Sequence, residues 1–159
     1  MNGRILLSAC ALVLAAVATI VGNSPAVAEQ VSVDACGIKM NVDIRTAPPG
    51  ADPSLTKYLG VFTGGRWDSH VCNALVVSDV RADGTATVRY IFTPTQEVPD
   101  GYFEKTDARF RNDRLFFYSK LGAEVWYSLR GDDSLDGDFI NKGYRYKLVE
   151  HPKRQSAQR

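Results

Sequence analysis

Residues 72–93 read CNALVVSDVRADGTATVRYIFT and contain two strand patterns separated by a turn. Cys72 to Val80 is an apolar, β-branched run, and Asp83-Gly84 is a dipeptide that favours a tight hairpin turn. From Thr85 to Thr93 small or apolar residues alternate with polar ones, which is typical of a strand with one buried face. This stretch therefore predicts an antiparallel pair of strands.

The same pattern continues towards the C-terminus, where short turns separate further alternating runs. It predicts eight strands, at about 65–69, 72–80, 85–93, 102–110, 114–120, 123–129, 134–140 and 144–149. Short sequential links favour a meander, and closure of a meander removes its exposed edges. We expect an all-β fold, an eight-stranded antiparallel up-and-down barrel, with a β-sandwich as the alternative.

Two further elements are expected before the barrel. Alternation over residues 38–44 predicts an N-terminal half-buried strand, and residues 46–52 form a linker. Asp52-Pro53 has the residue types of a helix start, so a short helix is expected over residues 54–62. The expected segments are residues 29–52 for the N-terminal strand and linker, 53–149 for the barrel, and 150–159 for a disordered basic tail.

The first 28 residues have the features of a secretory signal peptide. Arg4 precedes an almost wholly apolar run over residues 5–21, and Ala26-Val27-Ala28 resembles a cleavage site. An uncleaved anchor is the alternative. Lipidation at Cys10 is disfavoured, because most of the apolar run follows that residue. We expect cleavage at about Ala28, a periplasmic or secreted location, and no stable transmembrane anchor afterwards.

The expected mature chain is electrically balanced. Removing 28 of 159 residues leaves 131, and Arg4 is the only charged residue lost, which leaves 18 basic and 18 acidic residues. This balance argues against nucleic-acid binding, and the apolar content argues against disorder. Cys36 and Cys72 then remain, and in an exported chain they predict a disulfide. A reactive thiol beside His70 is the alternative.

Gly65-Arg66-Trp67, after the expected short helix, resembles the Gly-x-Trp motif of lipocalins and other calycins. The order of strands over about residues 53–149 is similar to that of small secreted lipocalin-like domains of bacteria. The resemblance implies structural roles for Gly65 and Trp67, with Trp67 closing one end of the barrel. It also implies an arginine over that tryptophan, for which Arg145 is the nearest candidate.

One register of the alternating strands is rich in tyrosine and phenylalanine, and the opposite register carries charged residues that predict a solvated outer face. Buried phenols need hydrogen-bond partners, so the inner register implies water, mutual pairing or a bound ligand. A barrel of this size holds one small ligand or is filled by its own side chains. The candidate ligand-binding residues are Tyr90, Phe92, Tyr102, Phe110, Tyr127, Tyr144 and Tyr146.

Three hypotheses about function remain open. The first is an exported, non-enzymatic barrel that binds a small amphipathic or hydrophobic molecule or a cell-envelope component. The second is a structural or protein-interaction module of the envelope, with a filled barrel and recognition through residues 94–101 and Trp126. The third is a small enzyme that uses Asp68, His70 and Tyr90 at the barrel mouth. No metal-ligand spacing, catalytic motif or cofactor motif is found in the sequence.

Overall fold

The computed structural model describes residues 27–68, 71–93 and 102–155, and the side chains at 102 and 103 lie outside that description. These residues form two antiparallel sheets and one short helix, so the all-β prediction is confirmed. The N-terminal hairpin consists of β1 (Ala28–Ala35) and β2 (Ile38–Arg45), and α1 spans Pro53–Thr56. The larger sheet contains β3 (Gly60–Arg66), β4 (Cys72–Val80), β5 (Thr85–Phe92), β6 (Tyr102–Arg111), β7 (Arg114–Tyr118), β8 (Glu124–Leu129), β9 (Leu135–Asn141), β10 (Tyr144–Lys147) and β11 (Lys153–Arg154).

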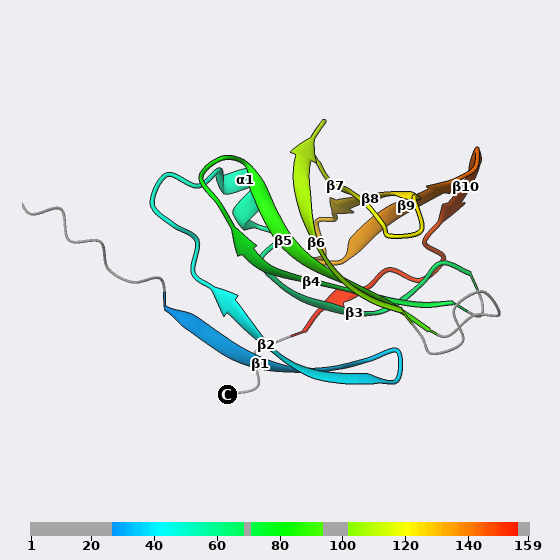
Figure 1. The fold of residues 1–159 in the computed structure, drawn as a ribbon, viewed down its shortest axis with the longest axis horizontal. Coiled ribbons are helices and arrows are strands. Elements are labelled where there is room, and N and C mark those ends of the chain that lie inside the picture. The colour runs from blue at the N-terminus through cyan, green and yellow to red at the C-terminus, as the bar shows by residue number, and fades with distance from the viewer. Residues whose placement is uncertain (1–26, 69–70, 94–101, 156–159) are drawn as a thin grey trace, which may run out of the picture.

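The larger sheet is a curled, nine-stranded meander (Figure 1). Each strand from β3 to β10 pairs with the next one in the sequence, as the short turns predict, and β11 pairs with β3 at the other edge. The first of these strands begins at Gly60 rather than at residue 65, and α1 ends at Thr56 rather than at residue 62. Gly60 has φ +133°, a conformation open to glycine, and it ends the turn after α1.

The C-terminal segment, residues 149–155, lies between β9 and β3, which are near opposite edges of the curled sheet. On one side the amide of Leu135, in β9, donates to the carbonyl of Pro152 over 2.9 Å. On the other side Arg66, in β3, donates to the carbonyl of Glu150 and accepts from the amide of Val149, both over 2.9 Å. The predicted disordered tail is therefore wrong as far as residue 155, because main-chain hydrogen bonds order this segment on both sides.

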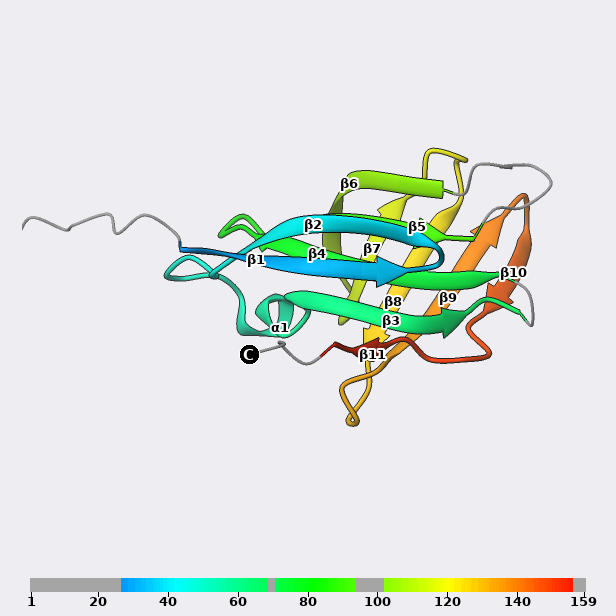
Figure 2. The same ribbon diagram turned by 90° about the horizontal axis from the view of Figure 1, so that it is seen from below.

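The β1–β2 hairpin covers the outer surface of β3 and β4 (Figure 2). Val33 and Val42 from the hairpin pack on Val76 of β4 and Ile91 of β5, and these side chains are almost completely buried. The prediction of a solvated outer face is therefore wrong for the part of the sheet that the hairpin covers. The run Cys72–Val80 is apolar in both registers because it lies between two cores.

The predicted disulfide between Cys36 and Cys72 is present. Cys36 lies in the turn of the hairpin, and Cys72 is the first residue of β4. The bond therefore fixes one end of the hairpin to the sheet that the hairpin covers.

The inner surface of the sheet encloses the main core, and its middle is filled by side chains. Tyr90 and Tyr127 are almost completely buried there, as the inner register predicts. Tyr144 and Tyr146 are exposed to 71% and 48%, so their predicted burial is wrong. They lie on β10, a short strand at the edge of the sheet, where alternation does not lead to an enclosed face.

Candidate functional site

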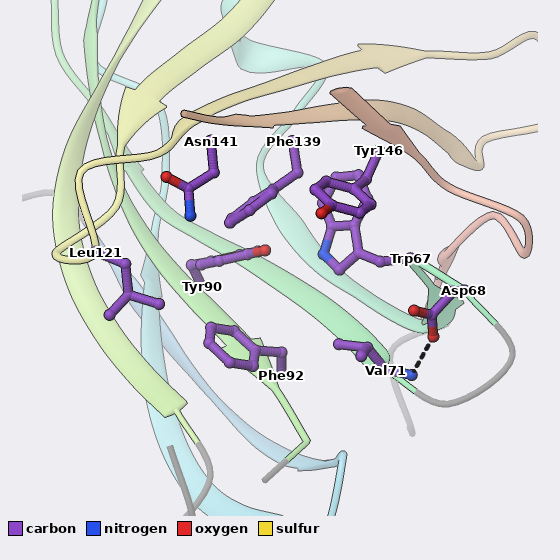
Figure 3. Close-up of a pocket in the computed structure, with 9 residues that line it drawn as sticks. All are labelled: Trp67, Asp68, Val71, Tyr90, Phe92, Leu121, Phe139, Asn141 and Tyr146. Atoms are coloured by element: carbon purple, nitrogen blue, oxygen red, sulfur yellow. Dashed lines mark hydrogen bonds between the residues drawn. The ribbon is translucent and has the colours of Figure 1, made fainter. Parts of the chain in front are cut away.

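A cavity of about 240 Å³ lies at one end of the curled sheet (Figure 3). This is the end where β3, β5 and β9 finish and where the turn from β7 to β8 lies. Its lining is mainly aromatic and apolar: Trp67, Asp68, Val71, Tyr90, Phe92, Leu121, Phe139, Asn141 and Tyr146. Tyr146 and Leu121 are 48% and 44% exposed, so part of the lining is in contact with solvent.

Trp67 forms one side of this cavity and is only 7% exposed. Its ring contacts Tyr127 and Phe139, with ring centroids 5.9 and 5.8 Å apart. Gly137 makes room for this packing, because a Cβ there would lie 3.1 Å from the Trp67 ring and 2.9 Å from Leu148. The Trp67 indole nitrogen has no hydrogen-bond partner in the described part of the chain.

The Tyr127 hydroxyl donates a hydrogen bond to the Asn73 side-chain oxygen over 3.0 Å, in the core next to Trp67. Burial raises the pKa of Tyr127 well above its usual value of 10.0, and the nearby Tyr90 phenol adds to this effect. The hydrogen bond to Asn73 lowers that pKa by a smaller amount. Tyr127 therefore stays a neutral hydrogen-bond donor near the cavity.

Tyr90 and Phe92 form the opposite side of the cavity, on β5. Their ring centroids are 5.5 Å apart, and Tyr90 also meets Phe117 edge-on at 5.5 Å. Since Tyr90 is 1% exposed and Phe92 6%, both rings are fixed by packing. The cavity therefore has a wall in place before any molecule enters it.

Phe139, Asn141 and Tyr146 form the remaining side, where β9 meets β10 (Figure 3). The rings of Phe139 and Tyr146 contact each other at 6.1 Å between centroids. Asp68 is the only charged residue among the described lining residues, and one of its carboxylate oxygens accepts from the Val71 amide over 2.9 Å. The cavity is therefore aromatic, with a few polar groups and one carboxylate.

The structure brings three of the seven predicted ligand-binding residues together at this cavity: Tyr90, Phe92 and Tyr146. Tyr127 packs against Trp67, which forms one side of the cavity. Tyr144 is exposed and is not part of the lining. Phe110 lies at the opposite end of the sheet, and the Tyr102 side chain lies outside the described residues.

Four lining residues, Val71, Leu121, Phe139 and Asn141, were absent from the predicted site, although the period of two places Phe139 in the inner register. Leu121 and Asn141 come from a turn and a strand end. Neither position carries an alternation signal, so the sequence pattern could not have identified them.

The Gly-x-Trp motif lies at the end of β3, not at its start. Gly65 is required there by a close approach, since a Cβ on this residue would lie 2.7 Å from the Pro152 ring. Arg145 does not take the position proposed for it, because its side chain faces Asp138 at 3.9 Å. The arginine of the C-terminal segment that lies over a ring is Arg154, 4.6 Å from the centroid of Phe62.

A second cavity, of about 400 Å³, lies at the end of the sheet near α1. Tyr58, Phe110 and Leu129 supply its apolar lining. The Tyr58 hydroxyl accepts from the Leu129 amide over 3.0 Å and donates to the Tyr127 carbonyl over 3.4 Å. Burial raises the pKa of Tyr58, although the hydrogen bond from Leu129 opposes that shift. The tyrosine at this cavity thus has its hydrogen bonds satisfied within the protein.

Trp126 lies on the outer face of β8 and is half-buried. Its ring packs on Phe116, with centroids 4.3 Å apart, and the Arg114 guanidinium lies 5.7 Å from it. Its indole nitrogen donates to Glu124 over 3.2 Å. The hairpin packs mainly on β3 and β4 and not on this part of the sheet.

In the described part of the chain no three histidine, cysteine, aspartate or glutamate side chains are grouped to hold a metal ion. None of its helices has the length and apolar character needed to cross a bilayer. His70 lies outside the described residues, so the geometry of the catalytic alternative is described only for Asp68 and Tyr90.

No protein-family model, curated protein or solved structure matches this chain.

Proposed function

We propose that this chain is an exported, non-enzymatic, lipocalin-like barrel that binds a small amphipathic or hydrophobic molecule in the cavity beside Trp67. The observation that carries the proposal is an open aromatic cavity at one end of a core that is otherwise filled by side chains. Concave, mainly apolar sites with a few polar groups are the usual form of small-molecule sites.

Export is part of this proposal. The disulfide between Cys36 and Cys72 fits an oxidising compartment. The apolar run before Ala28 and the cleavage pattern at residues 26–28 support a signal peptide. We therefore place the mature protein in the periplasm or outside the cell, where it would bind a free small molecule or a component of the envelope.

Tyr146→Ala tests the binding site, because the ring lines the cavity and contacts Phe139. With naphthalene as the probe, we expect affinity to fall about tenfold, as for the loss of one aromatic contact. Trp67 fluorescence in a Trp126→Phe background reports binding. Tyr144→Ala is the matched control, since Tyr144 is on the same strand and is not part of the lining. Equal affinities for the two variants would refute the site.

A protein-interaction module is the second candidate, and the stacked Phe116 and Trp126 on the outer face favour it. In this case a Trp126→Ala variant would lose a partner in pull-downs from the envelope. Retention of every partner by that variant would contradict this alternative.

An enzyme at the cavity mouth is the third candidate, and only the proximity of Asp68 to Tyr90 in one lining favours it. Catalysis needs several converging groups, and His70 is its remaining participant. A His70→Ala variant that keeps every cellular phenotype would remove this alternative.

A further inference from the structure

The more accessible rings of the Trp67 cavity are those of Phe139 and Tyr146, and they are set at an angle to each other. Their centroids are 6.1 Å apart and their planes are inclined by 59°. Phe139 is half-buried and Tyr146 is 48% exposed, and both line the cavity. Two rings inclined in this way can contact one rounded group on two of its sides, whereas stacked rings cover each other's faces.

A second pair of inclined rings, Tyr90 and Phe92, lies on the other side of the same space (Figure 3). Their planes are inclined by 53°, with centroids 5.5 Å apart. Both side chains are almost completely buried, so packing fixes their positions before a molecule enters. The cavity is therefore bordered by aromatic rings on two sides.

The electrostatics of these rings favour a positively charged group. The face of an aromatic ring carries partial negative charge, because of the ring's quadrupole. A cation close to several rings is attracted by each of them, and aromatic cages recognise alkylammonium groups in this way. An anion at the same faces would be repelled.

Asp68 adds a full negative charge to the lining. Its side chain is exposed, and Figure 3 shows it on the side of the cavity where Trp67 and Tyr146 lie. One of its carboxylate oxygens accepts from the Val71 amide over 2.9 Å, and this bond orients the carboxylate. Because the group is in contact with water, its attraction for a nearby cation is modest.

No basic residue among the described lining residues opposes this charge. Lys120 and Lys142 each adjoin a lining residue in the chain, but neither lines the cavity. Arg145 precedes Tyr146 on β10, so it projects from the other face of that strand, where Asp138 lies 3.9 Å from it. The net charge of the described lining is therefore negative.

The volume and the composition of the cavity suit a small quaternary ammonium group. A volume of about 240 Å³ exceeds the roughly 150 Å³ that suffices for benzene in an apolar cavity. A trimethylammonium group has fewer non-hydrogen atoms than benzene, so it fits with room for a short chain. Its methyl groups bury apolar surface against the rings, and it has no N–H that would need an acceptor.

We infer that the molecule bound beside Trp67 carries a quaternary ammonium group, which contacts the inclined rings of Phe139 and Tyr146 and is attracted by the Asp68 carboxylate. This inference rests on the proposed function, because it names the chemical class of the molecule that the cavity binds. The two rings and Asp68 then determine specificity for a cation over a neutral molecule of the same shape.

Choline and 3,3-dimethylbutan-1-ol test the inference, since they have the same shape and differ by a charged nitrogen in place of one carbon. We expect choline to bind about tenfold more tightly, as contact of a cation with two rings predicts. NMR titrations of the mature protein measure both affinities. Nuclear Overhauser contacts should join the choline methyl protons to the ring protons of Phe139 and Tyr146, which locates the cation in this cavity.

Asp68→Asn tests the carboxylate, because an asparagine oxygen can still accept from the Val71 amide. The affinity for choline should fall about threefold, and the affinity for the alcohol should not change. Asp113→Asn is the matched control, since it removes the same charge at the second cavity, at the opposite end of the sheet. Asp113 has φ +58°, a conformation that asparagine adopts readily. An equal effect of the two substitutions on choline binding would refute the role of Asp68.

Two other results would overturn the inference in different ways. If the alcohol binds in the cavity at least as tightly as choline, the preference for a cation is wrong and the proposed apolar binding site remains. If neither compound binds at millimolar concentration, the inference is wrong, and the naphthalene titration decides separately whether the proposed function stands. The comparison of the two probes uses the wild-type protein, so it does not depend on the folding of a variant.

Discussion

At the scale of single residues, two glycines and a proline decide how Trp67 is held. Gly137 leaves space for the Trp67 ring and Leu148, and Gly65 lets Pro152 approach the end of β3. A side chain at either glycine would need neighbouring groups to move, because its Cβ would lie within 3.0 Å of another heavy atom. The motif Gly65-x-Trp67 therefore has a local packing reason in this structure, whatever its likeness to lipocalins.

Tyr127 predicts how stability depends on pH at the alkaline end. Its pKa is raised by burial, so the folded protein keeps this proton when the unfolded chain loses it above about pH 10. The unfolded state is then favoured, and the free energy of unfolding should fall as pH rises through this range. In a Tyr127→Phe variant the fall should be shallower, although the variant starts about 1 kcal/mol less stable because Asn73 loses its partner.

Urea unfolding between neutral pH and about pH 11 measures this dependence. Tyr118→Phe is the matched control, because Tyr118 is exposed to 57%. A variant at Tyr127 with the same alkaline slope as the wild type would contradict the role given to its burial.

At the scale of secondary-structure elements, the sequence predicts strands well where one register is buried and the other is exposed. Strands β4 to β9 lie within a residue or two of their predicted bounds, because short turns separate runs that are apolar or alternating. β1 was not predicted, because its apolar residues are small (Ala28, Val31, Val33 and Ala35) and five of its eight residues are exposed. β11 was not predicted either, because its two residues are basic and are ordered by main-chain contacts with distant strands.

The candidate site was predictable only in part for a related reason. Tyr90 and Phe92 lie on a central strand, where alternation gives the correct face. Tyr144 lies on an edge strand, and Leu121 lies in a turn, where the face depends on which segments pack nearby. Such contacts are long-range and leave no local pattern in the sequence.

The hairpin and its disulfide give a prediction at this scale. A Cys36→Ala/Cys72→Ala variant should unfold with a free energy lower by about 2–4 kcal/mol, because the cross-link closes a long loop. Amide exchange should increase most in β1 and β2, which are held to the sheet by the core under the hairpin, by the disulfide and by an ion pair between Arg45 and Asp79 at 3.7 Å.

Urea unfolding with and without a reductant measures the effect on stability. Reduction should destabilise the wild type and leave the double variant unchanged. If the double variant and the oxidised wild type had the same unfolding midpoint, the bond would have no stabilising role.

At the scale of the whole molecule, the two open ends of the curled sheet differ in how their buried polar groups are hydrogen-bonded. Near α1 the hydroxyl of Tyr58 is bonded to the main chain of β8. At the other end the Trp67 indole N–H is buried without a partner among the described residues, near the cavity that Leu121 and Tyr146 help to line. The middle of the core is filled, so a small molecule would bind at an end and not along the axis. The binding site that we propose therefore lies at the Trp67 end.

The most direct test locates a bound probe by NMR. With indane added to the isotope-labelled mature protein, nuclear Overhauser contacts should join the probe to the ring protons of Trp67, Phe139 and Tyr146, which line one cavity. Contacts to Tyr58 and Phe110 at the other end, or no contacts at millimolar probe, would contradict the account.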